Sequence, residues 1–239
     1  MKRTLILAAL VGAVAASHAQ VVIYNNVVNF AGSGFANGGT ATVAGLETTR
    51  LVADDINLAI PGGSVTINAF RFSTANFNTA AVNARARVRF YANDGTTSTL
   101  GTYINGFTFA LAGTSAIQPG VTVWTVSPVS GLTLPKRFWA GITFDDGGGL
   151  SATTAAQLNN LGQGIYNPPT IGTSNPGAAF QSTAATAGLT SGIGGTYFNL
   201  GSTPSNFGWQ FESTVPEPGT MAALGLGVAA MLRRRKAAK

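Results

Sequence analysis

The chain has 239 residues, no cysteine, one histidine and a formal net charge of +6 at pH 7. This charge lies at the two ends, because residues 20–215 contain seven basic and seven acidic residues and are neutral overall. Because the middle of the chain is neutral, the overall positive charge is no evidence of nucleic-acid binding, and we exclude that class of partner. The missing cysteines exclude a disulfide framework.

The N-terminus has the three parts of a secretory signal peptide. Lys2 and Arg3 precede an apolar run over residues 4–16, and residues 17–19 place small side chains at −3 and −1 of a cut before Gln20. We therefore expect residues 1–19 to form a signal helix that the Sec export machinery uses and that is removed. His18 leaves with this segment, which excludes histidine-based nucleophilic sites and the usual zinc sites from the mature chain.

Residues 20–213 show short apolar or alternating runs separated by turn residues, which predict about ten short strands. A change of buried face near Ala69 predicts a bulge or crossover. One short helix is expected over residues 153–161, capped by Ser151 or Thr153 and ended by Gly162. Residues 31–45 and 164–195 are rich in glycine and turn residues and are expected to be mainly loops. The expected strands cover residues 21–24, 27–30, 49–60, 64–73, 84–91, 100–111, 121–126, 138–144, 178–181, 196–200 and 207–212.

Many short strands with almost no helix predict an all-β fold in which two antiparallel sheets pack face to face. We expect a jelly-roll-like antiparallel β-sandwich, with an immunoglobulin-like sandwich as the alternative. The sandwich would be flanked by the N-terminal signal helix and a short C-terminal transmembrane helix.

The strand over residues 84–91 alternates cleanly. Its small and apolar side chains are expected to point inward, and Arg85, Arg87, Arg89 and Tyr91 outward. The arginine row is a candidate contact for an anionic glycan, because guanidinium groups suit carboxylate and sulfate. The alternative is a solvated face with cross-strand partners, and that alternative is favoured.

The acids are the remaining candidates for chemistry. Asp54, Asp55, Asp145 and Asp146 could supply oxygen ligands to calcium, although capping of turns is the favoured interpretation and no cofactor is otherwise expected. A glycosidase needs two carboxyl groups in one site. Adjacent aspartates in a strand point to opposite faces, so Asp54 and Asp55 are not expected to form that pair, and the chain is not expected to be an enzyme.

Three tryptophans, Trp124, Trp139 and Trp209, could stack on sugar rings. Each lies in an expected strand, where a tryptophan is more often part of the core. Packing inside the sandwich is therefore the favoured interpretation for all three.

The C-terminus, residues 214–239, combines three unlike features. An extended linker over residues 214–218 contains Val215, Pro216, Glu217 and Pro218, and proline there excludes a helix interior. An uncharged apolar segment over residues 219–232 follows, and about 21 Å of helix would fall short of a hydrocarbon core of about 30 Å. The basic tail, residues 233–239, begins with Arg233, Arg234, Arg235 and Lys236, which we expect to act as a cytoplasmic membrane stop.

This order of triplet, apolar stretch and arginine cluster resembles the PEP-CTERM sorting signal of Gram-negative bacteria. The resemblance implies processing by an exosortase, passage through the inner membrane by way of the C-terminal helix, and then a place at the cell surface or outside the cell. It also implies association with exopolysaccharide. More weakly, residues 52–56 resemble the start of many PEP-CTERM ectodomains, which are secreted β-sandwiches.

We therefore expect an exported, exosortase-sorted and non-catalytic surface or matrix protein associated with exopolysaccharide. The alternatives are a carboxylate-based enzyme acting on polysaccharide, a calcium-dependent glycan-binding module, and a structural protein that self-associates through sheet edges.

Overall fold

The computed structural model describes residues 18–43, 45–148, 153–186, 188, 190–201 and 203–216. The chain divides into two units, residues 22–212 and the terminal segments 1–21 with 213–239. Of the terminal unit, only residues 18–21 and 213–216 are described. The expected signal helix and transmembrane helix lie outside the described residues.

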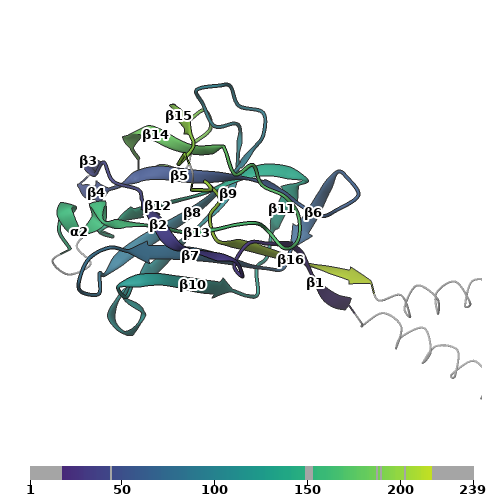
Figure 1. The fold of residues 1–239 in the computed structure, drawn as a ribbon, viewed down its shortest axis with the longest axis horizontal. Helices are drawn as coiled ribbons and strands as arrows, with labels where there is room; N and C mark the ends of the chain where they lie inside the picture. The colour runs from purple at the N-terminus through teal and green to yellow at the C-terminus, as the bar shows by residue number, and fades with distance from the viewer. Residues whose placement is uncertain are drawn as a thin grey trace, which may run out of the picture. The chain divides into compact units, whose positions relative to one another are not determined.

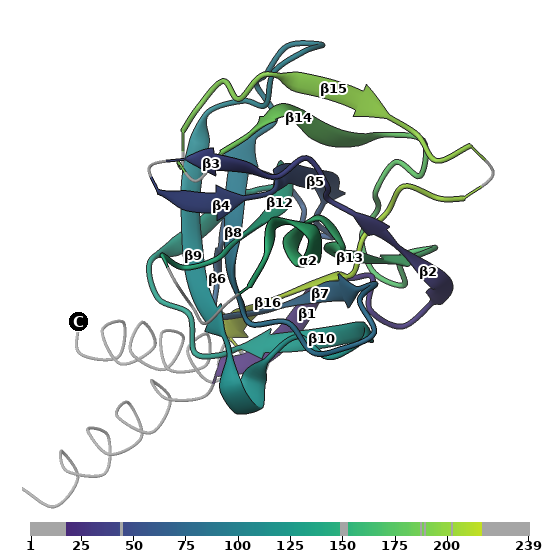
Figure 2. The same cartoon turned by 90° about the vertical axis from the view of Figure 1, so that its left-hand side faces the viewer.

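The unit of residues 22–212 is built from two large antiparallel sheets, drawn as stacked layers in Figures 1 and 2, and a separate two-stranded sheet. The first sheet has the order β1 (His18–Asn25), β16 (Trp209–Pro216), β7 (Ala69–Asn76), β13 (Leu161–Tyr166) and β2 (Phe30–Ala36), and β10 (Gly120–Val126) also pairs with β7. The second has the order β15 (Gly195–Phe198), β14 (Ala179–Ala185), β5 (Arg50–Asn57), β12 (Arg137–Asp145), β4 (Leu46–Thr48) and β3 (Ala41–Val43), and β8 (Ala84–Ala92) pairs with β12 and β9 (Tyr103–Leu111). The two-stranded sheet pairs β6 (Ser64–Ile67) with β11 (Leu132–Pro135). The described helical elements are the 3-10 turn η1 (Gly113–Ser115) and α2 (Ala155–Asn159).

Aromatic side chains hold the two sheets together. Phe70 of the first sheet meets Phe90 of the second with ring centroids 5.7 Å apart, and Phe138 meets Phe211 at 5.2 Å. All four rings are buried, and they lie in one continuous core. Aromatic pairs of this kind stabilise a core by about 1 kcal/mol beyond the area they bury. The all-β antiparallel sandwich predicted from the sequence is confirmed.

The outer face of the second sheet is covered at the C-terminal end of β8, contrary to expectation. Arg89 and Tyr91 are fully buried, whereas they were expected to point into solvent. Tyr91 belongs to a second apolar cluster with Leu100 and Ile193, and the Leu100 amide donates to the Ile193 carbonyl at 3.0 Å. Segments distant in sequence therefore pass over this face, which local alternation cannot reveal.

Two segments expected to be loops contain strands. Residues 31–45 hold most of β2 and all of β3, and residues 164–195 hold the last three residues of β13 together with β14, for which a shorter strand over residues 178–181 was expected. The glycines where β2 and β13 pair permit close strand contact: a Cβ at Gly34 would lie 2.9 Å from the Gln163 carbonyl oxygen, and one at Gly162 would lie 1.8 Å from the Phe35 carbonyl oxygen. The composition was misleading because the glycines in these strands let neighbouring backbones come close together, and do not form turns.

Three element boundaries also differ from expectation. The strand expected over residues 64–73 is divided at Asn68 between β6 and β7, which confirms a crossover near Ala69. The short helix is α2, and its cap is Thr154 in a capping box with Gln157, not Ser151 or Thr153. It ends before Gly162, which lies in β13.

The first and last strands of the chain extend beyond residues 22–212 into the terminal segments. β1 begins at His18, before the expected cut, and β16 reaches Pro216. Residues 214–216 of the expected linker are therefore strand.

Candidate functional site

Asp54 and Asp55 lie near the end of β5 and reach the same hydroxyl group. Ser174 Oγ is 2.9 Å from Asp54 Oδ1 and 3.4 Å from Asp55 Oδ1. The Phe207 amide donates to Asp54 Oδ2 at 2.8 Å, and the Asn175 amide donates to Asp55 Oδ1 at 2.9 Å. The two carboxyl groups therefore meet at one serine, and the expectation that strand alternation keeps them apart is wrong. The loop over residues 173–176 runs past the strand and bridges them.

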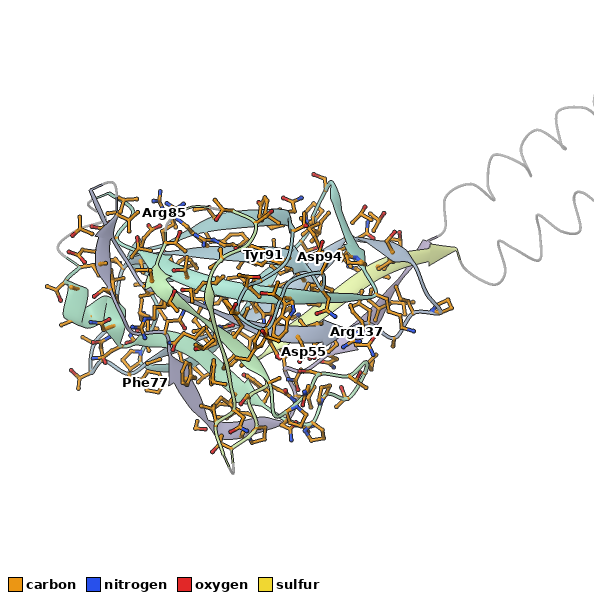
Figure 3. The ribbon with its side chains drawn as sticks, turned by 90° about the horizontal axis from the view of Figure 1, so that it is seen from above. Asp55, Phe77, Arg85, Tyr91, Asp94 and Arg137 are labelled. Atoms are coloured by element: carbon orange, nitrogen blue, oxygen red, sulfur yellow. The ribbon has the colours of Figure 1, made fainter. Side chains whose placement is uncertain are left out.

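The surroundings of Asp54 and Asp55 disfavour the charged form of both carboxyl groups. Asp54 is fully buried, and burial raises its pKa well above the ordinary value, with the charge of Asp55 acting in the same direction. Burial also raises the pKa of Asp55, against hydrogen bonds from Asn175 and Ser174 and the positive charge of Arg137. Figure 3 shows Arg137 and Asp55 in the same region of the second sheet.

Asp145 lies in a different place and has a different environment. It is fully buried at the end of β12, opposite Arg85 of β8. Arg85 Nε donates to its Oδ1 at 2.7 Å, and Arg87 Nε donates to its Oδ2. The Gly147 amide also donates to Oδ1, at 2.8 Å. Both oxygens of this carboxylate are engaged by cations, while Asp146 receives the Gly148 amide at 3.0 Å.

The four aspartates proposed as calcium ligands do not converge. Asp54 pairs with Ala140 of β12, five positions before Asp145, so the two acids are about 16 Å apart along the strand. Figure 3 likewise separates Arg85, the partner of Asp145, from Asp55. Within the described ranges, no three acidic, histidine or cysteine side chains are grouped so that they could hold a metal ion.

The three arginines of β8, Arg85, Arg87 and Arg89, have different environments. The side chains of Arg85 and Arg87 are 25% and 17% exposed and share Asp145. Arg89 is fully buried, and its Nη2 donates to the Thr186 carbonyl at 3.1 Å. Burial lowers the pKa of Arg89 and raises that of Tyr91 to about 12.

The three tryptophans have different environments. Trp209 and Trp139 are buried, as expected. Trp124 of β10 is half-buried and lines an open cleft of about 260 Å³ together with Phe72 and Phe109. Its indole Nε1 donates to Thr74 Oγ1 at 2.9 Å, which fixes the ring in place.

The last described strand leads into the C-terminal tail. Val215 and Pro216 end β16, and Glu217, Pro218 and the basic cluster Arg233, Arg234, Arg235 and Lys236 lie outside the described residues. The family described as PEP-CTERM protein-sorting motif matches residues 214–236. The chain carries a PEP-CTERM sorting motif. This motif implies an exported protein that crosses the membrane, is processed by an exosortase and is sorted to the surface.

The other comparisons give no relative: no curated protein and no solved structure matches the chain. None of the helices within the described ranges has the length and hydropathy needed to cross a bilayer. The expected membrane helix over residues 219–232 lies outside those ranges.

Sequence reasoning missed the partners of the acidic pair. Ser174, Asn175 and Phe207, which contact the pair, lie outside the regular strands, in segments without regular periodicity. The one local indication was the turn sequence at residues 175–177, which placed a loop there without showing what it approaches.

Proposed function

We propose that this PEP-CTERM protein is a non-catalytic surface or matrix protein that associates with exopolysaccharide through its β-sandwich. The sorting motif supports delivery to the surface. Residues 22–212 carry seven basic and seven acidic residues, so the domain is neutral and presents mainly uncharged hydrogen-bonding groups. A neutral surface of this kind suits a hydrated polymer of sugars better than a nucleic acid.

The observation that carries the proposal is the cleft beside Trp124. It is lined by the aromatic residues Phe109 and Trp124, with buried Phe72 behind them, and Thr125 and Ser127 also line it. No ionisable side chain lines it. Aromatic faces with a few hydroxyl groups match the apolar face and the edge hydroxyls of a neutral sugar ring.

The arginine row supports a second, weaker contact. The exposed parts of Arg85 and Arg87 could meet acidic groups of a polysaccharide, but their charge is already shared with buried Asp145. Arg89 is buried and would not take part. We therefore assign the main contact to the cleft and predict that replacing Arg85 or Arg87 weakens polysaccharide binding less than replacing Trp124.

A carboxylate-based polysaccharide enzyme is the second candidate, and the shared hydroxyl of Asp54 and Asp55 favours it. Glycosidases keep two carboxyl groups on opposite sides of the scissile bond, about 5 to 9.5 Å apart, with room for a sugar between them. Asp54 is fully buried and holds the Phe207 amide, so a polymer could not reach it without opening the fold. This arrangement supports a structural or ligand-holding role over hydrolysis.

Co-sedimentation of the purified full-length chain with exopolysaccharide from the producing strain tests the proposal. Trp124→Ala should weaken binding about fivefold, the equivalent of an aromatic contact of about 1 kcal/mol. Phe77→Ala is the matched control, because Phe77 is 49% exposed and does not line the cleft. Equal binding by both variants would contradict the cleft assignment, and release of reducing sugars that Asp54→Asn abolishes would favour the enzyme.

A further inference from the structure

β10 lies at the edge of the first sheet, at the lower margin of the domain in Figures 1 and 2. One side of this strand pairs with β7 in continuous antiparallel register from Gly120 to Val126. Among the described residues, none makes a backbone hydrogen bond to the other side of β10. An open strand edge of this kind pairs readily with a further strand.

The backbone groups on the open side of β10 belong to Val121, Val123 and Thr125. The Ser73 amide of β7 donates to the Gly208 carbonyl at 2.8 Å, on the side of β7 that faces away from β10. Opposed residues of an antiparallel pair alternate between hydrogen-bonded and non-hydrogen-bonded pairs, and Val123 lies opposite Ser73. Val123 therefore points its N–H and C=O away from β7, as do the residues two positions before and after it.

The sequence of β10, GVTVWTV, has none of the features that protect a strand edge. It contains no charge and no proline, five of its seven residues are β-branched, and its register with β7 has no bulge. The other described edges of the two large sheets are short, irregular or contacted: β3 and β15 have three and four residues, β2 and β9 have register shifts, and β1 accepts the amides of residues 59 and 170. Within the described structure, β10 is therefore the edge best suited to pairing.

We propose that β10 pairs antiparallel with β10 of a second copy of this chain, with the two-fold axis at Val123, so that the first sheets of two molecules become one. This register opposes Val123 to itself and Val121 to Thr125. It is the one register in which all three outward-facing residues of each copy are paired. The Val123 side chain, which is 37% exposed, would be covered by its copy, and Trp124 would lie beside Thr122 of the second copy, a favourable aromatic and β-branched pair.

The charge distribution suits a second copy as the partner. Residues 118–128 carry no charge, so the pairing places no like charges opposite each other. On the neighbouring strand, Arg71 lies opposite Thr125. The Arg71 backbones of the two copies would be about 20 Å apart, which is well beyond the Debye length of about 8 Å.

The area available on the edge predicts a weak dimer. A seven-residue strand is about 24 Å long, and with a sheet about 10 Å thick each copy would bury about 250 Å². A stable complex buries about 800 Å² on each partner, so we expect a Kd of about 10⁻⁴ to 10⁻³ M. Such pairing becomes effective where many copies are held on one surface, which is the destination that the sorting motif implies.

This role goes beyond the proposed polysaccharide contact. Because Trp124 belongs to β10 and also lines the cleft, the pairing would bring the clefts of two copies next to each other. One dimer would then present two adjoining ligand sites. The pairing itself needs no ligand in either cleft.

Disulfide formation by single-cysteine variants tests the proposal, because the chain has no cysteine of its own. In the proposed dimer the Cα atoms of the two Val123 residues are about 5.5 Å apart, within the disulfide range of about 4.4 to 6.8 Å. On mild oxidation in detergent and without polysaccharide, full-length Val123→Cys should form a covalent dimer about tenfold faster than full-length Val28→Cys. Val28 is the matched control, since it is 61% exposed and lies outside β10, and association through the shared apolar tail affects both variants equally.

Further variants test the register and the backbone pairing. Thr125→Cys alone should dimerise at the control rate, whereas a mixture of Val121→Cys and Thr125→Cys should form the mixed dimer rapidly. Adding Val123→Pro to both chains should abolish the mixed dimer and leave the Tm measured by tryptophan fluorescence nearly unchanged, because proline at an edge removes an N–H that the fold does not use.

Equal rates for Val123→Cys and Val28→Cys, or a mixed dimer that Val123→Pro does not affect, would overturn the proposal. On intact cells of the producing bacterium, a disulfide from Val123→Cys to a different protein in place of the dimer would assign the edge to that protein and would likewise overturn it. Each outcome is independent of polysaccharide binding, so failure here leaves the cleft assignment standing.

Discussion

Replacing Asp145 with asparagine should destabilise the sandwich strongly, because it removes the charge that Arg85 and Arg87 share. Asp145 is fully buried, whereas the two arginine side chains are 25% and 17% exposed. A hydrogen bond to a charged group contributes about 1.5 to 3 kcal/mol. Two such bonds would reach about 6 kcal/mol at most, and partial exposure of the arginines lets water replace part of each.

We therefore expect Asp145→Asn to lower the free energy of unfolding by about 3 kcal/mol, which corresponds to a fall in Tm of about 6 to 12 °C for a domain of this size. Arg85→Gln should cost about 1 to 2 kcal/mol, and its effect should not add to that of Asp145→Asn because the residues share one network. Urea unfolding followed by tryptophan fluorescence measures both changes.

Asp146→Asn is the control for this experiment, since Asp146 is the neighbouring acid and pairs with no arginine in the described structure. Its effect should stay within about 0.5 kcal/mol. If Asp145→Asn is no more destabilising than Asp146→Asn, the arginine row does not serve as the counter-charge of a buried acid. Its role as a ligand contact would then need to be reconsidered.

Three further predictions concern other parts of residues 22–212. Gly162→Ala should destabilise by more than about 2 kcal/mol, since its Cβ would meet the Phe35 carbonyl, and denaturant unfolding checks this. Trp209→Ala should cost about 3 to 5 kcal/mol in the same assay, clearly more than Trp124→Ala, because Trp209 is buried and Trp124 lines an open cleft. Hydrogen bonds from the Thr102 amide and hydroxyl lower the pKa of Asp94. Because the pKa of Asp94 is lower in the folded state, its ionised carboxylate stabilises the fold at pH values above the pKa of the unfolded state. This stabilisation is lost as the pH falls through the pKa of the folded state. An NMR titration should place its midpoint below that of an unfolded aspartate, and Asp94→Asn should remove the contribution.

The parts of the fold that depend on local sequence were predicted well. The alternation in β8 correctly placed Ala84, Ala86, Val88 and Phe90 in the core, because a strand with one face in a core shows its period directly. The sorting motif was also found, since its parts are contiguous and need no tertiary structure.

The errors arose where distant segments meet. Arg89 and Tyr91 were expected in solvent because alternation reports two faces but not whether the second face is covered. Asp54 and Asp55 were expected to be separated, and it is the loop containing Ser174 that brings their oxygens together. Glycine-rich β2 was expected to be a loop because glycine is common in turns. In the structure its glycines allow β2 to approach β13 closely, and this pairing cannot be seen in the local sequence.

Cell fractionation of the producing bacterium, with and without its exosortase, tests the central claim most directly. With the enzyme, mass spectrometry should find the chain at the surface or in the medium, starting at Gln20 and shortened at the C-terminus near Pro216. Without the enzyme, the chain should remain in the inner membrane with its basic tail intact. Finding the full-length chain in the cytoplasm, or the same processed form in both strains, would contradict the account.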